Sequence, residues 1–383
     1  MASNKNQHFV PRCYLRPFTI DGSISAINLY NIDRQKFIER APVKHQCSGD
    51  YFYGKDPLLE SAIQGIEGRY SNTLRELLKP GYVLTDEHRH ALRVFWLLQH
   101  LRTEAASRRS VEMTEAVQDV SGQTDSSFRY EIREAVQVAM KTFAVSMDSV
   151  ADLKVCLVRN RTGTPFITSD DPAVLTNRWH LESARTKGHS FGLHSAGDIF
   201  LLPVSPKILC IGFDGDVYSI PDRNGWTEVR RDADVEAFNQ HQFLNCRANV
   251  FVQDSANFQH VHESFLRAVP RRPERRHKLH YAVLDRREGG FASYRVDNCA
   301  EAGDHEEAMI HVQAMHARPV YWPRQISWRL NGFVFTNGTG VGYVRRTWTG
   351  GLYEQPFHRD SKMLEADVDE ILDNFGTKYK FAF

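Results

Sequence analysis

The segment Asn-Gln-His-Phe-Val-Pro-Arg-Cys-Tyr-Leu-Arg-Pro-Phe (residues 6–18) is the part of the chain that decides the fold. It follows the pattern H-x-x-P-x-x-Y-L-R-x-F, is rich in aromatic residues and contains no glycine or serine. Disordered N-terminal segments rarely have this composition, because they lack the apolar side chains that a core requires. We therefore expect the chain to begin packing within its first ten residues.

The bulk composition predicts a folded protein outside the membrane. Of the 383 residues, 42% are hydrophobic and 11% aromatic, which is enough to bury a core. The 48 Lys and Arg nearly balance the 47 Asp and Glu, so nucleic-acid binding would need a local basic patch. No run of eighteen apolar residues indicates a membrane span, and the first residues lack the apolar core of a secretion signal. The six cysteines form no C-x-x-C pair, which is typical of reduced thiols, so we expect a cytoplasmic location.

The first half of the sequence predicts a hairpin followed by three helices. Residues 23–40 contain two short apolar runs around a turn. Apolar residues at helical spacing predict helices over 57–79, from 86 to about 110, and over 126–150. Asp56 and Thr85 are the expected caps of the first two helices. After residue 150 we predict strands over 153–158, 166–168, 199–204, 208–213 and 249–252, and a helix over 232–246.

These elements predict an α+β fold, because strands and helices do not alternate regularly as they do in a doubly wound sheet. We expect the N-terminal hairpin and a helical bundle to pack on a mixed β-rich half. The basic, proline-containing stretch 266–280 is a candidate boundary, so we divide the chain into domains 6–253 and 254–383. The second part should be a β-rich C-terminal extension, with helices around residues 305–316 and over 364–375.

Four segments in the same order resemble an uncharacterised family, the domain of unknown function 4238. They are the opening motif, Leu101-Arg102-Thr103 at a helix end, the turn Ser169-Asp170-Asp171-Pro172, and Phe200–Pro206, which reads L-x-P-x-S-P from Leu201. The resemblance covers roughly residues 6–253 and implies no chemistry. His100 stands where an apolar or tyrosyl residue is expected, so the family implies no role for it.

We expect the catalytic residues to be His8, Asp170 and Glu67, in a metal-dependent hydrolase that acts on nucleic acid. His8 and Asp170 would bind a divalent ion, Mg²⁺ or Mn²⁺, because histidine and carboxylate side chains are common ligands and acid–base groups. Asp170 is preferred to Asp171, since a residue before proline tends to lie in the turn. Serine, aspartate and proline are also ordinary turn residues, so a structural role remains open. The expected substrate-binding residues are Arg12, Arg16, Arg102 and Asn239.

Two other functions remain open. Arg93 and His100 lie two helical turns apart and resemble the R-x(4–6)-H motif of metal-independent, two-chain helical ribonucleases, in which His is the base and Arg holds the phosphate. Alternatively, the protein is a non-catalytic binding module or a subunit of a larger assembly. Such a module would bind nucleic acid or a protein partner, with Arg271 and Arg272 of the basic stretch as its contact residues.

Overall fold

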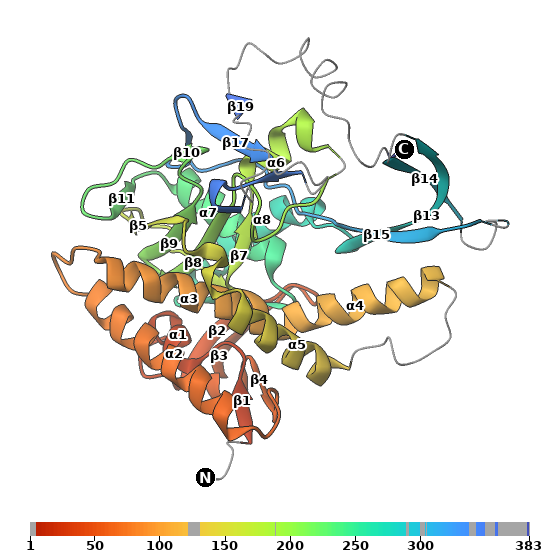
Figure 1. Cartoon of the computed structure of the whole chain (residues 1–383). Coiled ribbons are helices and arrows are strands. Elements are labelled where there is room, and N and C mark those ends of the chain that lie inside the picture. Colours follow the sequence, from red (N-terminus) through yellow and green to blue (C-terminus); the bar gives the residue numbers. More distant parts are fainter. Residues whose placement is uncertain are drawn as a thin grey trace.

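We describe the protein from a computed structural model, which covers residues 5–121, 131–187, 189–288, 291–298, 303, 305–336, 342–348, 357–358 and 381–382. Helices and several mixed sheets follow one another without regular alternation, so the predicted α+β class is confirmed. Helices α2 to α5, coloured orange to yellow, gather on one side of the strands β5, β8 and β9 (Figure 1). The strands β13 to β15 extend to the right of the view, above α4 (Figure 1).

The opening segment is ordered and packed, as its composition predicts. It forms strand β1 (Asn6–His8), helix α1 (Arg12–Leu15) and a 3-10 turn (Arg16–Phe18). Tyr14, Leu15 and Phe18 are fully buried. These apolar side chains anchor the start of the chain in the core.

The predicted hairpin belongs to a sheet that joins distant parts of the sequence. Its two strands are β2 (Ala26–Asn31) and β3 (Lys36–Pro42). The sheet order is β3-β2-β12-β6, with β12 at Asn249–Val252 and β6 at Thr168–Ser169. A separate pair is formed by β1 and β4 (Ser48–Asp50). Because β12 bonds to both β2 and β6, the turn that holds Asp170 is fixed close to the N-terminal hairpin.

The helical layer differs from the sequence prediction at one point. The helices are α2 (Pro57–Leu77), α3 (Asp86–Arg102), α4 (Glu104–Ser121) and α5 (Ile132–Val145). The single helix predicted from 86 to about 110 is wrong, because the backbone of Thr103 is extended. The Thr103 hydroxyl instead accepts from the N–H of Ala106 and so caps α4. The helix predicted over 126–150 ends at Val145, and its residues 126–130 lie outside the described part of the chain.

The five-stranded sheet is buried on both faces. Its order is β11 (Trp226–Val229), β5 (Lys154–Asn160), β9 (Ile208–Phe213), β8 (Ile199–Ser205) and β7 (Val174–Thr176). Val155 and Leu157 pack toward α2 and α3, while the alternating Cys156 and Val158 pack toward α7 (Asp232–Asn245). This alternation follows from the two-residue period of a strand. The inner strands β8 and β9 are nearly continuous apolar runs because neither of their faces meets water, whereas the edge strand β11 is half-buried.

The C-terminal part is rich in strands, as predicted. Helix α8 (Phe258–Ala268) precedes a sheet of order β15-β13-β14-β20, formed by Ala308–Ala314, His277–Glu288, Phe291–Asp297 and Phe381–Ala382. The shorter strands are β10 (Tyr218–Ser219) with β16 (Ser327–Trp328), and β17 (Phe333–Thr336) with β18 (Tyr343–Val344) and β19 (Phe357–His358).

Two helices predicted for this part have different outcomes. The helix expected around residues 305–316 is wrong, because most of that segment pairs antiparallel with β13 as strand β15. The helix expected over 364–375 lies outside the described residues. The domain boundary after residue 253 stays a prediction, although β13 contacts α4 of the first part.

Candidate functional site: a cavity lined by histidine and arginine

The segments quoted for the family resemblance contribute buried residues that bond to distant parts of the chain. The Tyr14 hydroxyl donates to the carbonyl of Pro203 (2.6 Å) and bonds the Thr168 hydroxyl (2.7 Å). Tyr14 and Thr168 are fully buried, and burial raises the pKa of the tyrosine. We call Tyr14, Thr168, Asp170, Pro203 and Arg102 the motif core. Its hydrogen bonds join segments that are far apart in the sequence.

Asp170 holds the backbone that leads from α7 to β12. Its Oδ1 accepts from the N–H of Arg247 (2.8 Å), and its Oδ2 accepts from the N–H groups of Ala248 and Asn249 (both 2.9 Å). Burial raises the pKa of Asp170 to about 6, and the three N–H groups act in the opposite direction. Both carboxylate oxygens therefore have partners inside the fold.

His8, the other residue predicted to bind a metal, lies in β1. Its Nδ1 bonds the carbonyl of Gln46 (3.1 Å). Burial lowers the pKa of His8, the bond to Gln46 acts in the opposite direction, and the charge of Arg12 adds a smaller lowering. No hydrogen bond or ion pair between described residues joins His8 to Asp170. Nor do the described residues contain a group of three or more His, Cys, Asp or Glu side chains placed to hold a metal ion.

The remaining predicted site residues are divided between the interior and the surface. Glu67 and Arg102 are brought together in an ion pair (2.8 Å), in which the Arg102 side chain is fully buried. Asn239 is buried too, and it accepts from the N–H of Ile167 and donates to the carbonyl of Pro165. Arg12 and Arg16 are exposed. Arg102 and Asn239 are thus occupied by internal contacts rather than presented to a substrate.

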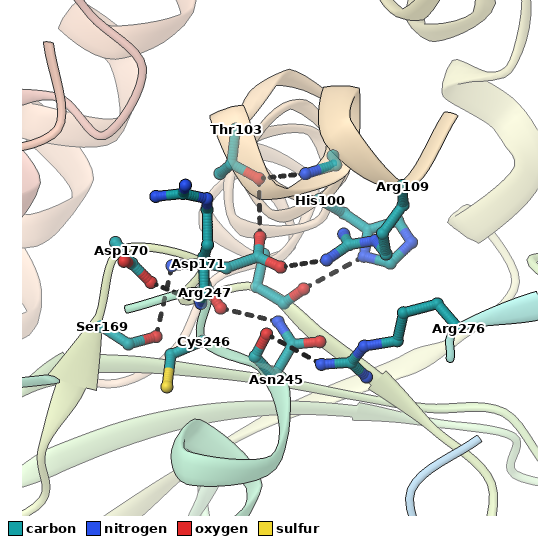
Figure 2. Close-up of polar contacts among 12 residues, drawn as sticks. His100, Thr103, Arg109, Ser169, Asp170, Asp171, Asn245, Cys246, Arg247 and Arg276 are labelled. Atoms are coloured by element: carbon teal, nitrogen blue, oxygen red, sulfur yellow. Dashed lines mark hydrogen bonds and ion pairs between the residues drawn. The ribbon is translucent and has the colours of Figure 1, made fainter. Parts of the chain in front are cut away.

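Asp171, which the sequence analysis set aside, anchors an arginine. Its carboxylate is fully buried, accepts from the Thr103 hydroxyl (2.7 Å) and pairs with Arg109 (2.6 Å). The break between α3 and α4 puts Thr103 in place for this contact. Figure 2 shows Asp171 between Thr103 and Arg109, with Arg276 and Asn245 beyond them.

Arg109 and Arg276 line a cavity of about 250 Å³, together with His100, His241 and Asn245. We call it the His–Arg cavity. Its other lining residues come from three segments: 174–176, 191–193 and 314–317, with Leu244 and His277. The cavity therefore combines side chains from both sides of the predicted domain boundary.

The His–Arg cavity has an excess of positive charge. Arg109 is paired with Asp171, whereas Arg276 has no carboxylate partner among the described residues. Arg276 donates from Nη2 to the carbonyl of Leu244 (2.9 Å), at the C-terminal end of α7. Burial, together with the charges of Arg109 and Arg272, lowers the pKa of Arg276 to about 10. An anion in the cavity would relieve this repulsion.

The histidines of the cavity favour their neutral forms. His100 Nδ1 lies 3.0 Å from the carbonyl oxygen of Ala173, which only accepts, so Nδ1 carries the proton and Nε2 is the basic nitrogen. The ring stacks on Trp96, and burial lowers its pKa. Burial also lowers the pKa of His241 to about 4. A neutral histidine beside two guanidinium groups can accept a proton while the arginines hold an anion.

Arg93, the predicted partner of His100, lies elsewhere. Its Nε donates to the carbonyl of Leu153 (2.8 Å), and burial lowers its pKa. Arg93 is not among the residues that line the cavity, where Arg109 stands close to His100 instead. The helical pattern placed His100 on a face with Arg93, but the break at Thr103 brings in an arginine from the next helix.

The basic stretch 266–280 is folded rather than a free linker. Arg272 donates from Nη2 to the carbonyl of Cys246 (3.0 Å) and from Nη1 to that of Phe243, and Arg276 binds the carbonyl of Leu244. Positive side chains at the C-terminal end of a helix satisfy its free carbonyls and the helix dipole. Arg272, predicted as a contact residue for a partner, is thus used to fix the end of α7.

The central sheet is covered by helices on both faces, and the His–Arg cavity lies at the junction of α3, α4, α7 and β13. The chain matches the profile described as "Protein of unknown function (DUF4238)" over residues 6–256 and belongs to that family. No curated protein and no solved structure matched the chain. Within the described residues, no helix has the length and apolar character needed to cross a membrane.

Proposed function

We propose that the protein is a hydrolase of phosphodiesters, a nuclease, and that its chemistry takes place in the His–Arg cavity without a metal ion. One observation carries the proposal: a neutral histidine with a defined basic nitrogen lines the same cavity as two arginines, of which only Arg109 is paired with a carboxylate among the described residues. The proposal keeps His100 as the base, as in the helical ribonuclease hypothesis, and replaces Arg93 with Arg109 and Arg276.

In this mechanism His100 Nε2 takes a proton from the attacking hydroxyl group, which is water or a ribose 2′-hydroxyl. The attacking oxygen forms a bond to phosphorus as the bond between phosphorus and the leaving oxygen breaks. A water molecule protonates the leaving oxygen, and His100 then returns its proton to the solvent. The hydrogen bond from Nδ1 to the carbonyl of Ala173 orients the ring and supports the positive charge that it gains. Arg109 and Arg276 stabilise the negative charge that develops on the phosphate oxygens. Asp171 positions Arg109 and fixes its orientation.

The test is to incubate the purified protein with labelled single-stranded RNA and DNA, with EDTA and separately with Mg²⁺ or Mn²⁺. We expect cleavage that survives EDTA and falls about a hundredfold or more in His100→Asn, because the base is lost. Asparagine can still donate to the carbonyl of Ala173, so this variant removes Nε2 with little change in the fold. Arg93→Gln is the matched control and should retain activity.

Other results would assign the protein to the alternatives. Cleavage that EDTA abolishes, and that Asp170→Ala also removes from a protein that remains folded, would support the metal-dependent hydrolase with His8 and Asp170. Binding of RNA without cleavage under any condition would support a non-catalytic module. We also propose a cytoplasmic location, which the free thiols of the five described cysteines support.

A further inference from the structure

We infer that the His–Arg cavity takes one unpaired nucleotide, whose phosphate lies at Arg109 and Arg276 and whose base meets His241 and the aromatic rings of Phe191 and His316. This inference rests on the proposed function, because it names the substrate unit of the same cavity. It assigns to His241 a role in recognising the base. Three features of the cavity support it.

The first feature is a buried nitrogen without a partner. His241 is only 2% exposed, lines the cavity, and its Nε2 has no hydrogen-bond partner among the described residues. Such a group costs free energy in the folded protein, and nearly all buried polar atoms have partners. Nε2 is itself buried, so a ligand in the cavity reaches it only when the His241 ring turns toward the cavity, and that bond would remove the cost. The edge of a nucleobase offers both donors and acceptors for such a bond.

The second feature is an aromatic surface in the same cavity. The rings of Phe191 and His316 are stacked, with centroids 3.5 Å apart and an angle of 15° between the planes. The N–H of Phe191 donates to Nε2 of His316 (3.1 Å), which fixes the imidazole against the phenyl ring. Both residues line the cavity. Aromatic rings of this kind stabilise an unpaired base by stacking, whatever its sequence.

The third feature is the size of the cavity. Its volume of about 250 Å³ lies just below the roughly 300–1,000 Å³ of typical small-molecule sites, so it admits no more than one nucleotide unit. A double helix is far wider, since its major groove alone measures about 12 Å across. A base that is paired and stacked would have to leave the helix to enter, which costs free energy. The cavity therefore favours single-stranded nucleic acid.

The test measures binding by calorimetry with four probes: inorganic phosphate, ribose 5-phosphate, adenosine 5′-monophosphate and adenosine 3′-monophosphate. We expect the wild-type protein to bind at least one of the adenosine monophosphates about tenfold more tightly than ribose 5-phosphate, because a base that stacks on aromatic rings strengthens binding. In His241→Phe, the nucleotide should bind about fivefold to tenfold more weakly, the effect of one hydrogen bond. Inorganic phosphate should bind this variant as it binds the wild type.

Tyr70→Phe is the matched control for His241→Phe. The Tyr70 hydroxyl is also buried without a partner among the described residues, but it lies between α2 and α3 in the core, against Phe95. Both substitutions remove an unpaired polar atom, so neither should lower the melting temperature. Only His241→Phe should weaken nucleotide binding.

The possible failures are distinguishable. If the protein cleaves RNA but binds the adenosine monophosphates no more tightly than ribose 5-phosphate, the inference is wrong while the proposed function stands. The same conclusion follows if His241→Phe binds the nucleotide as the wild type does. If no probe binds and no strand is cleaved, the proposed function itself fails. The comparison of probes on the wild type needs no variant, so the inference can be tested even if His241→Phe does not fold.

Discussion

The motif core and the His–Arg cavity lie close together, yet they treat polar groups in opposite ways. In the motif core, the hydroxyl of Tyr14, the carboxylate of Asp170 and the guanidinium of Arg102 all have partners within the fold. In the cavity, His241 has an unpaired nitrogen, and Arg276 forms no ion pair with a carboxylate among the described residues. A stable fold requires that nearly all buried polar groups have hydrogen-bond partners. Groups left unsatisfied in a cavity are where a ligand gains most.

The two regions also differ in their relation to the family. All residues of the motif core fall inside the matched range 6–256, whereas Arg276 and His316 of the cavity fall outside it. A resemblance built on the motif core therefore describes how the chain folds. The proposed chemistry depends in part on the C-terminal residues of this particular protein.

The first prediction tests whether Asp170 belongs to the fold rather than to catalysis. Asp170→Asn replaces a carboxylate that accepts three backbone N–H bonds with an amide. The NH₂ group of the amide cannot accept, so it would face one backbone N–H group in place of Oδ1 or two in place of Oδ2. We expect a loss of about 3–5 kcal/mol of stability, as for other buried charged groups deprived of their partners. Denaturant unfolding at pH 7.5 measures it. A stable Asp170→Asn protein without nuclease activity would contradict this assignment, because Asp170 would then be needed for catalysis rather than for folding.

The second prediction compares two buried tyrosines. Tyr14→Phe removes two hydrogen bonds and leaves the carbonyl of Pro203 without this donor, so it should cost about 2 kcal/mol. Tyr70→Phe removes a hydroxyl that has no partner within the described residues and should be neutral or slightly stabilising. Thermal unfolding of both variants gives the difference. Equal losses would show that hydrogen bonding in the motif core contributes little to stability.

Local patterns in the sequence were enough to predict the main elements of the fold. The capped start of α2 at Asp56, the hairpin β2–β3 and the apolar strands of the central sheet all follow from side chains that are neighbours along the chain. The break at Thr103 was missed because the competing partner of its hydroxyl, Asp171, is far away in the sequence. Without knowledge of that contact, the spacing of the apolar residues predicts a helix that continues through Thr103.

The candidate site was less predictable for the same physical reason. Arg109, His241 and Arg276 belong to no motif, and only the packing of α4, α7 and β13 brings them to one cavity. Asp170 was preferred to Asp171 from the position of the proline, but the chain turns so that Asp171 reaches the cavity arginine. The basic stretch 266–280 gave a weak signal of the site, because it is rich in arginine. Its charge and its prolines predicted an exposed surface, but Arg272 and Arg276 turn inward to the end of α7.

The third prediction tests the unpaired state of His241 through the pH dependence of stability. The pKa of His241 falls from 6.5 to about 4 on folding, so unfolding takes up a proton at this residue between those pH values. The contribution of neutral His241 to the free energy of unfolding is therefore fully present above pH 6.5 and is lost as the pH falls toward 4. At pH 5.5, in phosphate-free buffer, this loss is about 1.4 kcal/mol. His241→Phe has no such proton to take up, so the stability difference between pH 8 and pH 5.5 should be smaller in the variant by that amount.

The comparison between wild type and variant is needed because other groups titrate in the same range. The pKa values of Asp170 and Asp214 are raised to about 6 by burial, so their contribution has the opposite sign and makes the fold more stable as the pH falls. These acids, and the cavity residues His100, His277, His316, Arg109 and Arg276, are common to both proteins and cancel in the difference. Identical pH profiles would mean that His241 is already paired or protonated in the folded protein, and the cavity would then resemble the motif core in satisfying its own polar groups.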